Sequence, residues 1–194
     1  MNALTATTNG GHDPMQAYLD DLLVEEDVPV VEENVPGPVM ASEYYAFELT
    51  GMRLLIPAAA IDAVDKSPAG IAAAGGAGWL AGFATMEVGM LPVVDACRLL
   101  GLPGSALTAD RPGALVKLTE QAGLIAVPAP GSLVAVETST VTWRGPGGRR
   151  PWLAGVQAAS RSVLLDVAGL ATMLAAVACN TENPNDLPTD ANVN

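Results

Sequence analysis

The stretch that decides the fold runs from Trp79 to Gly101 and reads WLAGFATMEVGMLPVVDACRLLG. Its apolar run predicts a strand from Val88 to Val94 that is buried on most sides. Pro92 interrupts the run, and because proline cannot donate a ladder hydrogen bond, we expect this strand at a sheet edge or at a bulge. Asp95 follows, where its carboxylate can cap the free N–H groups of a short helix. The stretch therefore predicts a strand that turns directly into a helix.

A related pattern returns late in the chain, where WLAGV is followed by LLDV, and this repetition indicates two similar halves. Short runs with strand character lie on both sides of the opening stretch, separated by turn signals. The expected strands cover residues 45–49, 52–57, 58–64 (after a single turn), 114–118, 124–127, 133–141, 152–156 and 162–167, and a helix is expected over 169–178. Strands of this length and spacing are typical of a barrel or a sandwich.

The acidity of the chain is confined to its two ends. The chain carries 21 acids and 9 bases, which gives a formal net charge of −12. Nine of the acids precede Tyr44 and three follow Cys179, with no Lys or Arg in either segment. The body between them is neutral and has no basic patch, which argues against binding to nucleic acid or to an anionic membrane surface.

No segment of the sequence predicts secretion or membrane insertion. The N-terminus lacks a basic region followed by an apolar core. Residues 67–86 carry no charge, but they are mostly Ala and Gly, which favours a loop leading into a strand over a membrane span. Cys97 and Cys179 lie far apart without CxxC spacing, so a bridge between them stays open and a reducing compartment is the simpler interpretation. We expect a cytoplasmic protein.

A short amphipathic helix is predicted near the N-terminus, at about residues 14–26. Asp13 is its expected cap, Pro14 its first helical residue, and Gln16 can reach back toward the cap. Acids occupy one face, and the other face carries an apolar stripe at helical spacing: Met15, Tyr18, Leu19, Leu22 and Leu23. A helix this short is marginal alone in water. The stripe either folds back on the chain's own core or docks in a groove of another protein, with the acidic, proline-containing segment 28–40 as linker.

The residue types that catalysis, metal binding or cofactor binding require do not come together in this sequence. His12 is the single histidine and lies in a polar tail, so neither a His-based triad nor a His metal site can form. The two cysteines cannot make a structural zinc site alone. Gly76-x-Gly78-x-x-Ala81 imitates a dinucleotide fingerprint, but it neither follows a clear strand nor opens a helix. We expect no enzyme activity, no cofactor and no metal.

Residues 43–176 resemble the CheW-like domain of bacterial chemosensory adaptors. The resemblance rests on a hairpin over 45–57 with Gly51 at its turn, on Leu80-x-Gly82 with Pro92-Val93-Val94-Asp95, on the hairpin at Gly123-Leu124, and on Leu153-x-Gly155 with Leu164-Leu165-Asp166. The structural motif residues are Gly82, Pro92, Asp95, Gly155 and Asp166. The resemblance implies a mainly β fold of two packed SH3-like five-stranded β-barrels. To this the sequence adds a C-terminal helix, an acidic, largely disordered extension over 1–42 that carries the short helix, and a disordered acidic tail over 177–194.

Members of this family are non-catalytic couplers, so the resemblance implies an adaptor that links chemoreceptors to a CheA-type histidine kinase in chemotaxis or in pilus or motility signalling. The chain departs from the family at one place. The family usually reads Asn-Leu-Arg-Gly where this chain has Thr85-Met86-Glu87-Val88, and the acid on the third strand that pairs with the Arg is replaced by Ala63. Losing both partners together avoids an unpaired charge at a semi-buried site. We therefore expect a changed partner surface.

The candidate partner-binding residues fall into two groups. On the body they are Ile61, Ala63, Val64, Thr85 and Glu87, and on the N-terminal helix they are Tyr18, Leu19, Leu22 and Leu23. The expected partners are proteins: a CheA-type histidine kinase, a chemoreceptor tip or a polar localisation protein. Two alternatives keep the same fold, namely a sensor subunit that holds a small ligand between the barrels and an inhibitor that occupies a partner without coupling it.

Overall fold

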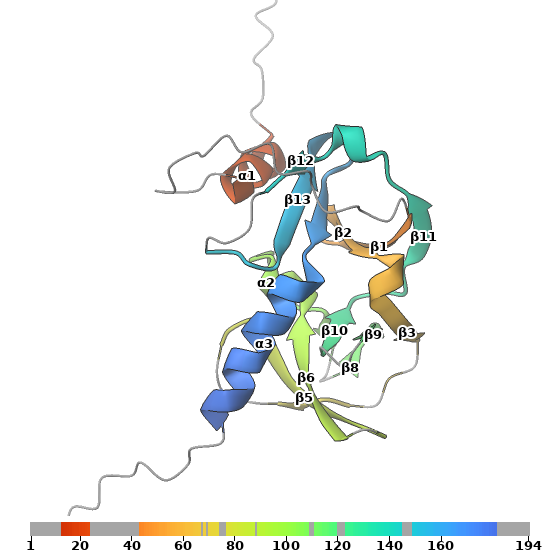
Figure 1. The fold of residues 1–194 in the computed structure, drawn as a ribbon, viewed down its shortest axis with the longest axis vertical. Helices are drawn as coiled ribbons and strands as arrows, with labels where there is room; N and C mark the ends of the chain where they lie inside the picture. Colours follow the sequence, from red (N-terminus) through yellow and green to blue (C-terminus); the bar gives the residue numbers. More distant parts are fainter. Residues whose placement is uncertain are drawn as a thin grey trace, which may run out of the picture.

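The computed structural model describes residues 13–23, 43–66, 68, 70–73, 77–87, 89–108, 111–119, 123–144 and 149–181. In these residues the protein is mainly β, with two six-stranded sheets, one two-stranded ribbon and three α-helices (Figure 1). The predicted mainly β class is therefore confirmed. The predicted disorder of the N-terminal extension and of most of the C-terminal tail falls outside the described residues.

Sheet A and sheet B make up most of the body. In hydrogen-bonded order, sheet A consists of β11 (Ser132–Ala135), β1 (Glu43–Leu49), β2 (Met52–Pro57), β14 (Ser162–Leu165), β13 (Leu153–Gln157) and β12 (Thr142–Trp143). Sheet B consists of β3 (Ile61–Asp65), β9 (Ala114–Leu118), β10 (Leu124–Val127), β6 (Gly89–Asp95), β5 (Leu80–Met86) and β4 (Ala72–Ala73). The ribbon pairs β7 (Leu107–Thr108) with β8 (Arg111–Pro112). Each six-stranded sheet has five longer strands and a two-residue strand at one edge, whereas the resemblance implied five strands.

The two sheets follow one plan, which confirms the two related halves. In sheet A the antiparallel hairpins β1–β2 and β13–β14 meet through the parallel pair β2–β14. In sheet B the hairpins β9–β10 and β5–β6 meet in the same way through the parallel pair β10–β6. The halves also exchange one strand each, because β3 follows β2 in the chain but lies in sheet B, and β11 follows β10 but lies in sheet A.

One helix lies in the N-terminal segment, and one helix follows each of the two related halves. They are α1 (Pro14–Leu23), α2 (Ala96–Leu99) directly after β6, and α3 (Val167–Thr181) after β14. Asp13 caps α1 as predicted, since its Oδ1 accepts from the N–H of Met15 at 3.0 Å. The Gln16 amide instead donates to Asp20, so it does not reach back to the cap. α3 continues through Thr181, so the predicted disordered tail does not begin at residue 177.

One large hydrophobic core joins both sheets and all three helices. Its fully buried members include Phe47 and Leu54 from sheet A, Val93 and Leu124 from sheet B, and Leu170 from α3. A second, smaller cluster lies on sheet A around Tyr44 and Leu164. The shared core makes the two sheets one packed body.

Of the two positions predicted for the strand containing Pro92, the sheet edge is wrong, whereas a bulge lies next to Pro92, where the β5–β6 register shifts between Leu80 and Gly82 opposite Val94 and Val93. β6 is an internal strand, paired with β5 on one side and β10 on the other. The β10 ladder begins opposite Val93, so Pro92 lies just outside it and its missing N–H leaves no gap there. The strand begins at Gly89, and Val88 is not among the described residues.

The single strand predicted over 133–141 is also wrong, because the chain breaks into β11, a short 3₁₀ turn η3 (Thr138–Thr140) and β12. Hydrogen bonds with Glu137 hold the turn. Its carbonyl accepts from the hydroxyl of Thr140 at 2.7 Å, and its carboxylate accepts from the hydroxyl of Ser139 at 3.0 Å. Such local bonds compete with strand pairing.

Candidate partner-binding groove

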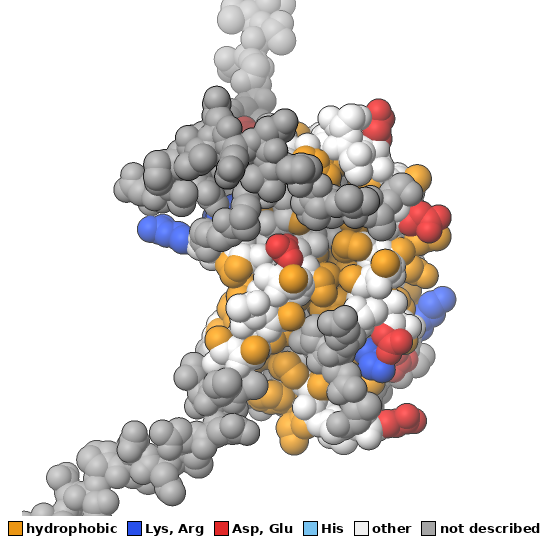
Figure 2. All heavy atoms as spheres, viewed as in Figure 1, with side chains coloured by type: hydrophobic (Ala, Val, Ile, Leu, Met, Phe, Trp, Pro, Cys, Tyr) orange, Lys and Arg blue, Asp and Glu red, His pale blue; other side chains and the backbone are white. Residues whose placement is uncertain are grey.

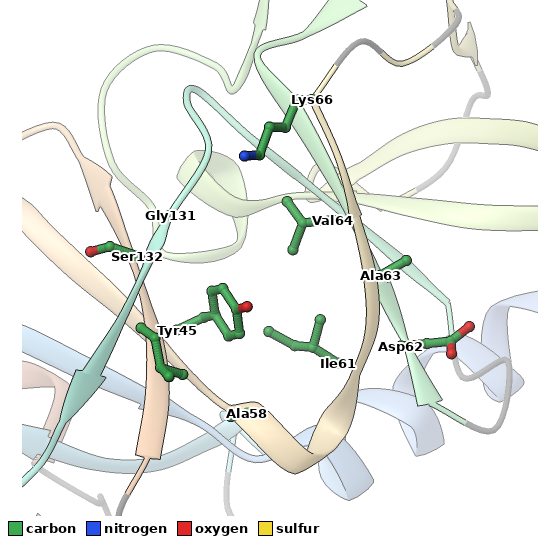
Figure 3. Close-up of a pocket in the computed structure, with 10 residues that line it drawn as sticks. Tyr45, Ala58, Ile61, Asp62, Ala63, Val64, Lys66, Gly131 and Ser132 are labelled. Carbon is green, nitrogen blue, oxygen red and sulfur yellow. The ribbon is translucent and has the colours of Figure 1, made fainter.

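A groove separates the facing edges of the two sheets. β3 is the edge strand of sheet B and β11 the edge strand of sheet A, and between them lies a cavity of about 510 Å³. Figure 3 shows how its lining residues lie; they are Tyr45, Ala58, Ile61, Asp62, Ala63, Val64, Lys66, Gly131, Ser132 and Leu133. The groove therefore exists because β3 follows the β1–β2 hairpin of sheet A in the chain but pairs with β9 in sheet B.

The turn η1 (Ala58–Ala60) makes this crossing. It connects β2 in sheet A to β3 in sheet B, so the groove receives Tyr45 from one sheet and Ile61 and Val64 from the other. The Tyr45 ring stacks on Phe47 with centroids 6.2 Å apart, and Phe47 itself is fully buried. A buried neighbour thus holds the aromatic wall in place.

Apolar and polar groups both line the groove, and its charged lining residues are Asp62 and Lys66. Ile61, Val64 and the Tyr45 ring point into the cavity, and the Lys66 ammonium lies at one end (Figure 3). Leu133 is 51% exposed. On the face viewed in Figure 2, hydrophobic side chains gather over β1 and β11, with charged side chains around them. Such a surface suits a protein segment that presents both apolar and polar groups.

The structure brings together three of the five body residues that the sequence singled out. Ile61, Ala63 and Val64 all line the groove from β3. The Ala63 side chain points away from the cavity (Figure 3), and Ala63 pairs with Lys117 in the β9 ladder. Lys117 makes a 2.5 Å ion pair with Asp62. The acid that precedes Ala63 in the sequence therefore pairs with the base that lies opposite Ala63 in the ladder.

Thr85 and Glu87 lie elsewhere, at the tip of the β5–β6 hairpin. Both are exposed, and three strands (β9, β10 and β6) separate β5 from β3 in the hydrogen-bonded order of sheet B. Met90 lies opposite Thr85 and is 66% exposed, one of two large apolar side chains described as exposed. The predicted body surface is thus divided between the groove and this hairpin.

The helix residues face the chain's own body, so the structure has the first of the two predicted arrangements. Leu19 and Leu22 are 0% and 1% exposed and belong to the large core. Tyr18 and Leu23 are half-buried beside them, and the Tyr18 hydroxyl donates to the carbonyl oxygen of Leu100. Burial raises the pKa of the Tyr18 phenol above its ordinary value, and nearby Asp21 adds to this while Arg150 opposes it. A partner could reach the two leucines only if α1 left this position.

The motif aspartates have the structural roles that the sequence predicts. Asp95 is fully buried, and its carboxylate accepts hydrogen bonds from the backbone of Cys97, Arg98 and Ala106 and from the Ser105 hydroxyl. Asp166 accepts from the N–H of Gly169 at 2.9 Å. Burial, together with the adjacent Asp95, raises the pKa of the Cys97 thiol, which is free and buried.

In the part of the chain that the structure describes, no three His, Cys, Asp or Glu side chains cluster in a way that could hold a metal ion. No helix among the described residues is both long and apolar enough to cross a bilayer. The groove residues that sequence reasoning missed are Tyr45, Ala58, Asp62, Lys66, Gly131, Ser132 and Leu133. Tyr45 was visible only as part of an alternating strand, and the others depend on the exchange of β3 and β11.

Comparison with known proteins supports the fold. No protein-family model matches the chain, and no curated protein matches its sequence. Among solved structures it is similar to the crystal structure of the scaffolding protein TtCheW from Thermoanaerobacter tengcongensis, with a TM-score of 0.52 and 12% sequence identity. The match covers 66% of this chain and 90% of that one. The predicted CheW-like fold is therefore confirmed, and at this identity the similarity concerns the fold alone.

Proposed function

We propose that this protein is a non-catalytic scaffold of a bacterial chemosensory assembly, which works in the cytoplasm by holding protein partners together. The observation that carries the proposal is the fold similarity to a scaffolding protein over most of that protein's length. The proposed partners are a chemoreceptor tip and a CheA-type histidine kinase, or a pole-organising protein in place of one of them. We also propose that each sheet closes into an SH3-like barrel.

The groove between β3 and β11 is the proposed docking surface. Its lining includes the apolar side chains of Ile61, Val64 and Leu133, and it is bordered by the edge strands of two sheets. Edge strands have backbone groups available for another strand, and apolar walls between them can take alternate side chains of an extended segment or one face of a helix. An acidic residue on the partner would complement Lys66 at the end of the groove.

The β5–β6 hairpin tip is the proposed second contact. Thr85, Glu87 and the exposed Met90 lie there, at a distance of three strands from β3 in sheet order. A scaffold needs at least two surfaces that can be occupied together, and these two do not share a residue. Where the CheW-like family usually has Arg, this chain has Glu87. The reversed charge supports a partner that has a basic residue at this contact.

Reconstitution separates a coupler from an inhibitor. The full-length chain is mixed with a CheA-type kinase and with the cytoplasmic part of a chemoreceptor from the same organism, singly and together. A coupler gives a ternary complex in size-exclusion chromatography with light scattering. Binding of each partner that excludes the other would identify an inhibitor, and binding of neither would overturn the proposal.

A further inference from the structure

The two related halves of the body are half A, with the hairpins β1–β2 and β13–β14, and half B, with the hairpins β5–β6 and β9–β10. They differ in the helix that follows each of them. In half A, β14 ends at Leu165, and Asp166 leads into α3, which has fifteen residues. In half B, β6 ends at Asp95 and leads into α2, which has only four. Both aspartates accept from the backbone at the start of their helix, so the two helix starts are equivalent.

α3 connects half A to half B. Its first turn lies against half A, because a Cβ on Gly169 would fall 1.8 Å from the carbonyl oxygen of Pro151. Further along, Leu174 reaches the turn between β9 and β10 in half B, where a Cβ on Gly123 would fall 2.6 Å from its Cδ1. Leu170 and Leu174 are buried in the large core. The helix therefore acts as a strut between the two sheets.

α2 cannot make the matching connection, because the chain turns away after Leu100 at Gly101, which has a φ of +66°. α1 lies between the end of α2 and the β1–β2 turn, where a longer α2 would make the connection that α3 makes. The Tyr18 hydroxyl donates to the carbonyl oxygen of Leu100, at the end of α2 in half B. At the other side Met15 reaches the β1–β2 turn of half A, with its Cε 3.4 Å from where a Cβ on Gly51 would lie. Gly51 in half A corresponds to Gly123 in half B.

Two ion pairs hold the ends of α1 on half A. Asp13 pairs with Arg161 at 2.6 Å, at the turn between β13 and β14. Asp21 pairs with Arg150 at 3.1 Å, and the same guanidinium donates to the Asp21 carbonyl oxygen at 2.9 Å. Partly exposed pairs of this kind contribute little energy each, but bonds at both ends fix the register of the helix on the sheet. The buried Leu19 and Leu22 provide the attachment itself.

We propose that α1 is the second strut between the halves, that it replaces the continuation α2 lacks, and that it thereby sets the width of the β3–β11 groove. α1 lies beside β13, on the side of the molecule away from β3 and β11 (Figure 1). The groove is bordered by one strand from each sheet, so its width depends on how the sheets are held against each other. That α1 thereby tunes partner binding rests on the proposed function, whereas the strut itself does not.

A distance measurement across the groove tests the strut without a partner. Spin labels are placed in the full-length chain at Ala63→Cys on β3 and Ser132→Cys on β11, with Cys179→Ser, so that the buried Cys97 is the one native thiol left. Both side chains point away from the cavity, so the labels leave it open (Figure 3). Hydrogen exchange of residues 14–23 in the same samples reports whether α1 is attached.

Leu22→Ala is the test variant, Leu22→Met the conservative one and Asp20→Asn the exposed control. For Leu22→Ala we expect protection in α1 to fall roughly 30-fold or more, as truncation of one buried leucine implies, and the inter-label distance distribution to broaden. Leu22→Met and Asp20→Asn should keep the narrow distribution. Tyr18→Phe removes only the bond to Leu100 and should broaden the distribution less, which keeps the test decisive if Leu22→Ala does not fold.

An unchanged distance distribution in a variant whose α1 has lost protection would overturn the strut. Full protection of α1 in both Leu22→Ala and Tyr18→Phe would overturn it as well, because the proposed contacts would then not hold the helix. The proposed function fails by a different result, the absence of partner binding in the reconstitution. The two failures are therefore distinguishable.

Discussion

The backbone N–H of Asp95 donates to the carbonyl oxygen of Trp79 at 2.9 Å, and the N–H of Asp166 donates to the carbonyl oxygen of Trp152 at 2.7 Å. These two bonds close the same unit in each half: a Trp-Leu-Ala-Gly strand, a return strand, and an aspartate that begins a helix. Both units also shift register at one place, between Leu80 and Gly82 and between Leu153 and Gly155. The repeated sequence pattern is therefore a repeated structure.

The two aspartates should differ in how much they stabilise the protein. Asp95 is fully buried and accepts from four residues, so Asp95→Ala leaves several buried donors without a partner and should cost about 3 kcal/mol or more. Asp166 is half-buried with one such bond, so Asp166→Ala should cost about 1 kcal/mol. Urea unfolding measures both, and equal losses would contradict the difference in roles.

The glycine of each unit should not tolerate a side chain. A Cβ on Gly82, whose φ is +149°, would lie 2.0 Å from the carbonyl oxygen of Ala72, and one on Gly155 would lie 2.8 Å from that of Thr142. These are the short edge strands β4 and β12, which pair closely because the glycines have no Cβ. We expect Gly82→Ala to cost at least about 2 kcal/mol and Gly155→Ala somewhat less.

Gly78→Ala is the matched control for these variants, because a Cβ there meets nothing within 4 Å. Its melting temperature should stay near that of the wild type. A Gly82→Ala protein as stable as Gly78→Ala would show that β4 does not pack as described.

The attachment of α1 predicts a stability loss when its leucines become polar. Leu19→Ser with Leu22→Ser should lower the free energy of unfolding by about 4 kcal/mol or more, because both side chains are buried in the large core. Thermal unfolding measures the loss, with the exposed Asp20→Ser as control. A melting temperature that stays unchanged would instead favour a helix that binds a partner.

Alkaline pH should loosen α1. The pKa of Tyr18 is raised in the folded state, chiefly by burial, above the unfolded value of about 10. A raised pKa means that the neutral phenol stabilises the fold, so its contribution is complete below about pH 10 and is lost as pH rises through the folded pKa. Hydrogen exchange of residues 14–23 across this range measures the loss.

Two tyrosine variants separate the sources of this pH effect. Tyr18→Phe removes the ionising group, so exchange in α1 should no longer increase with the same pH dependence. Burial also raises the pKa of Tyr44, whose hydroxyl is buried without a hydrogen-bond partner in the described structure. Tyr44→Phe should leave the pH response of α1 unchanged and should not lower stability, because no bond is lost. An α1 response that disappears only in Tyr44→Phe would contradict the assignment.

Much of the fold was readable because local signals agreed with it. The β1–β2 and β9–β10 hairpins, the cap at Asp13 and the aspartates that begin α2 and α3 all follow from spacing and turn chemistry within a few residues. Pro92 did not decide between an edge and a bulge, because its effect depends on which neighbouring strand pairs with it. The ladder between β6 and β10 begins at Val93, one residue after Pro92, so β6 can be an internal strand. The break after β11 depended on bonds of Glu137 that strand propensity does not include.

The groove was only half predictable. Ile61 and Val64 could be singled out from the family resemblance, but Leu133 and Tyr45 join them only because β3 and β11 exchange sheets, and that exchange has no local signal. The position of α1 was also undetermined, because the same apolar stripe suits either the chain's own core or a partner. Only the structure shows that Leu19 and Leu22 are buried in the chain's own core.

The most direct test of the scaffold assignment is the affinity of the full-length chain for the chemoreceptor's cytoplasmic part and for the CheA-type kinase, measured by calorimetry. The variants are Ile61→Asp and Val64→Asp in the groove, with the exposed Ala159→Asp as control. We predict that each groove variant weakens binding of at least one partner by about tenfold or more, while the control binds like the wild type. Wild-type affinity in both groove variants, or no binding by the wild type, would contradict it.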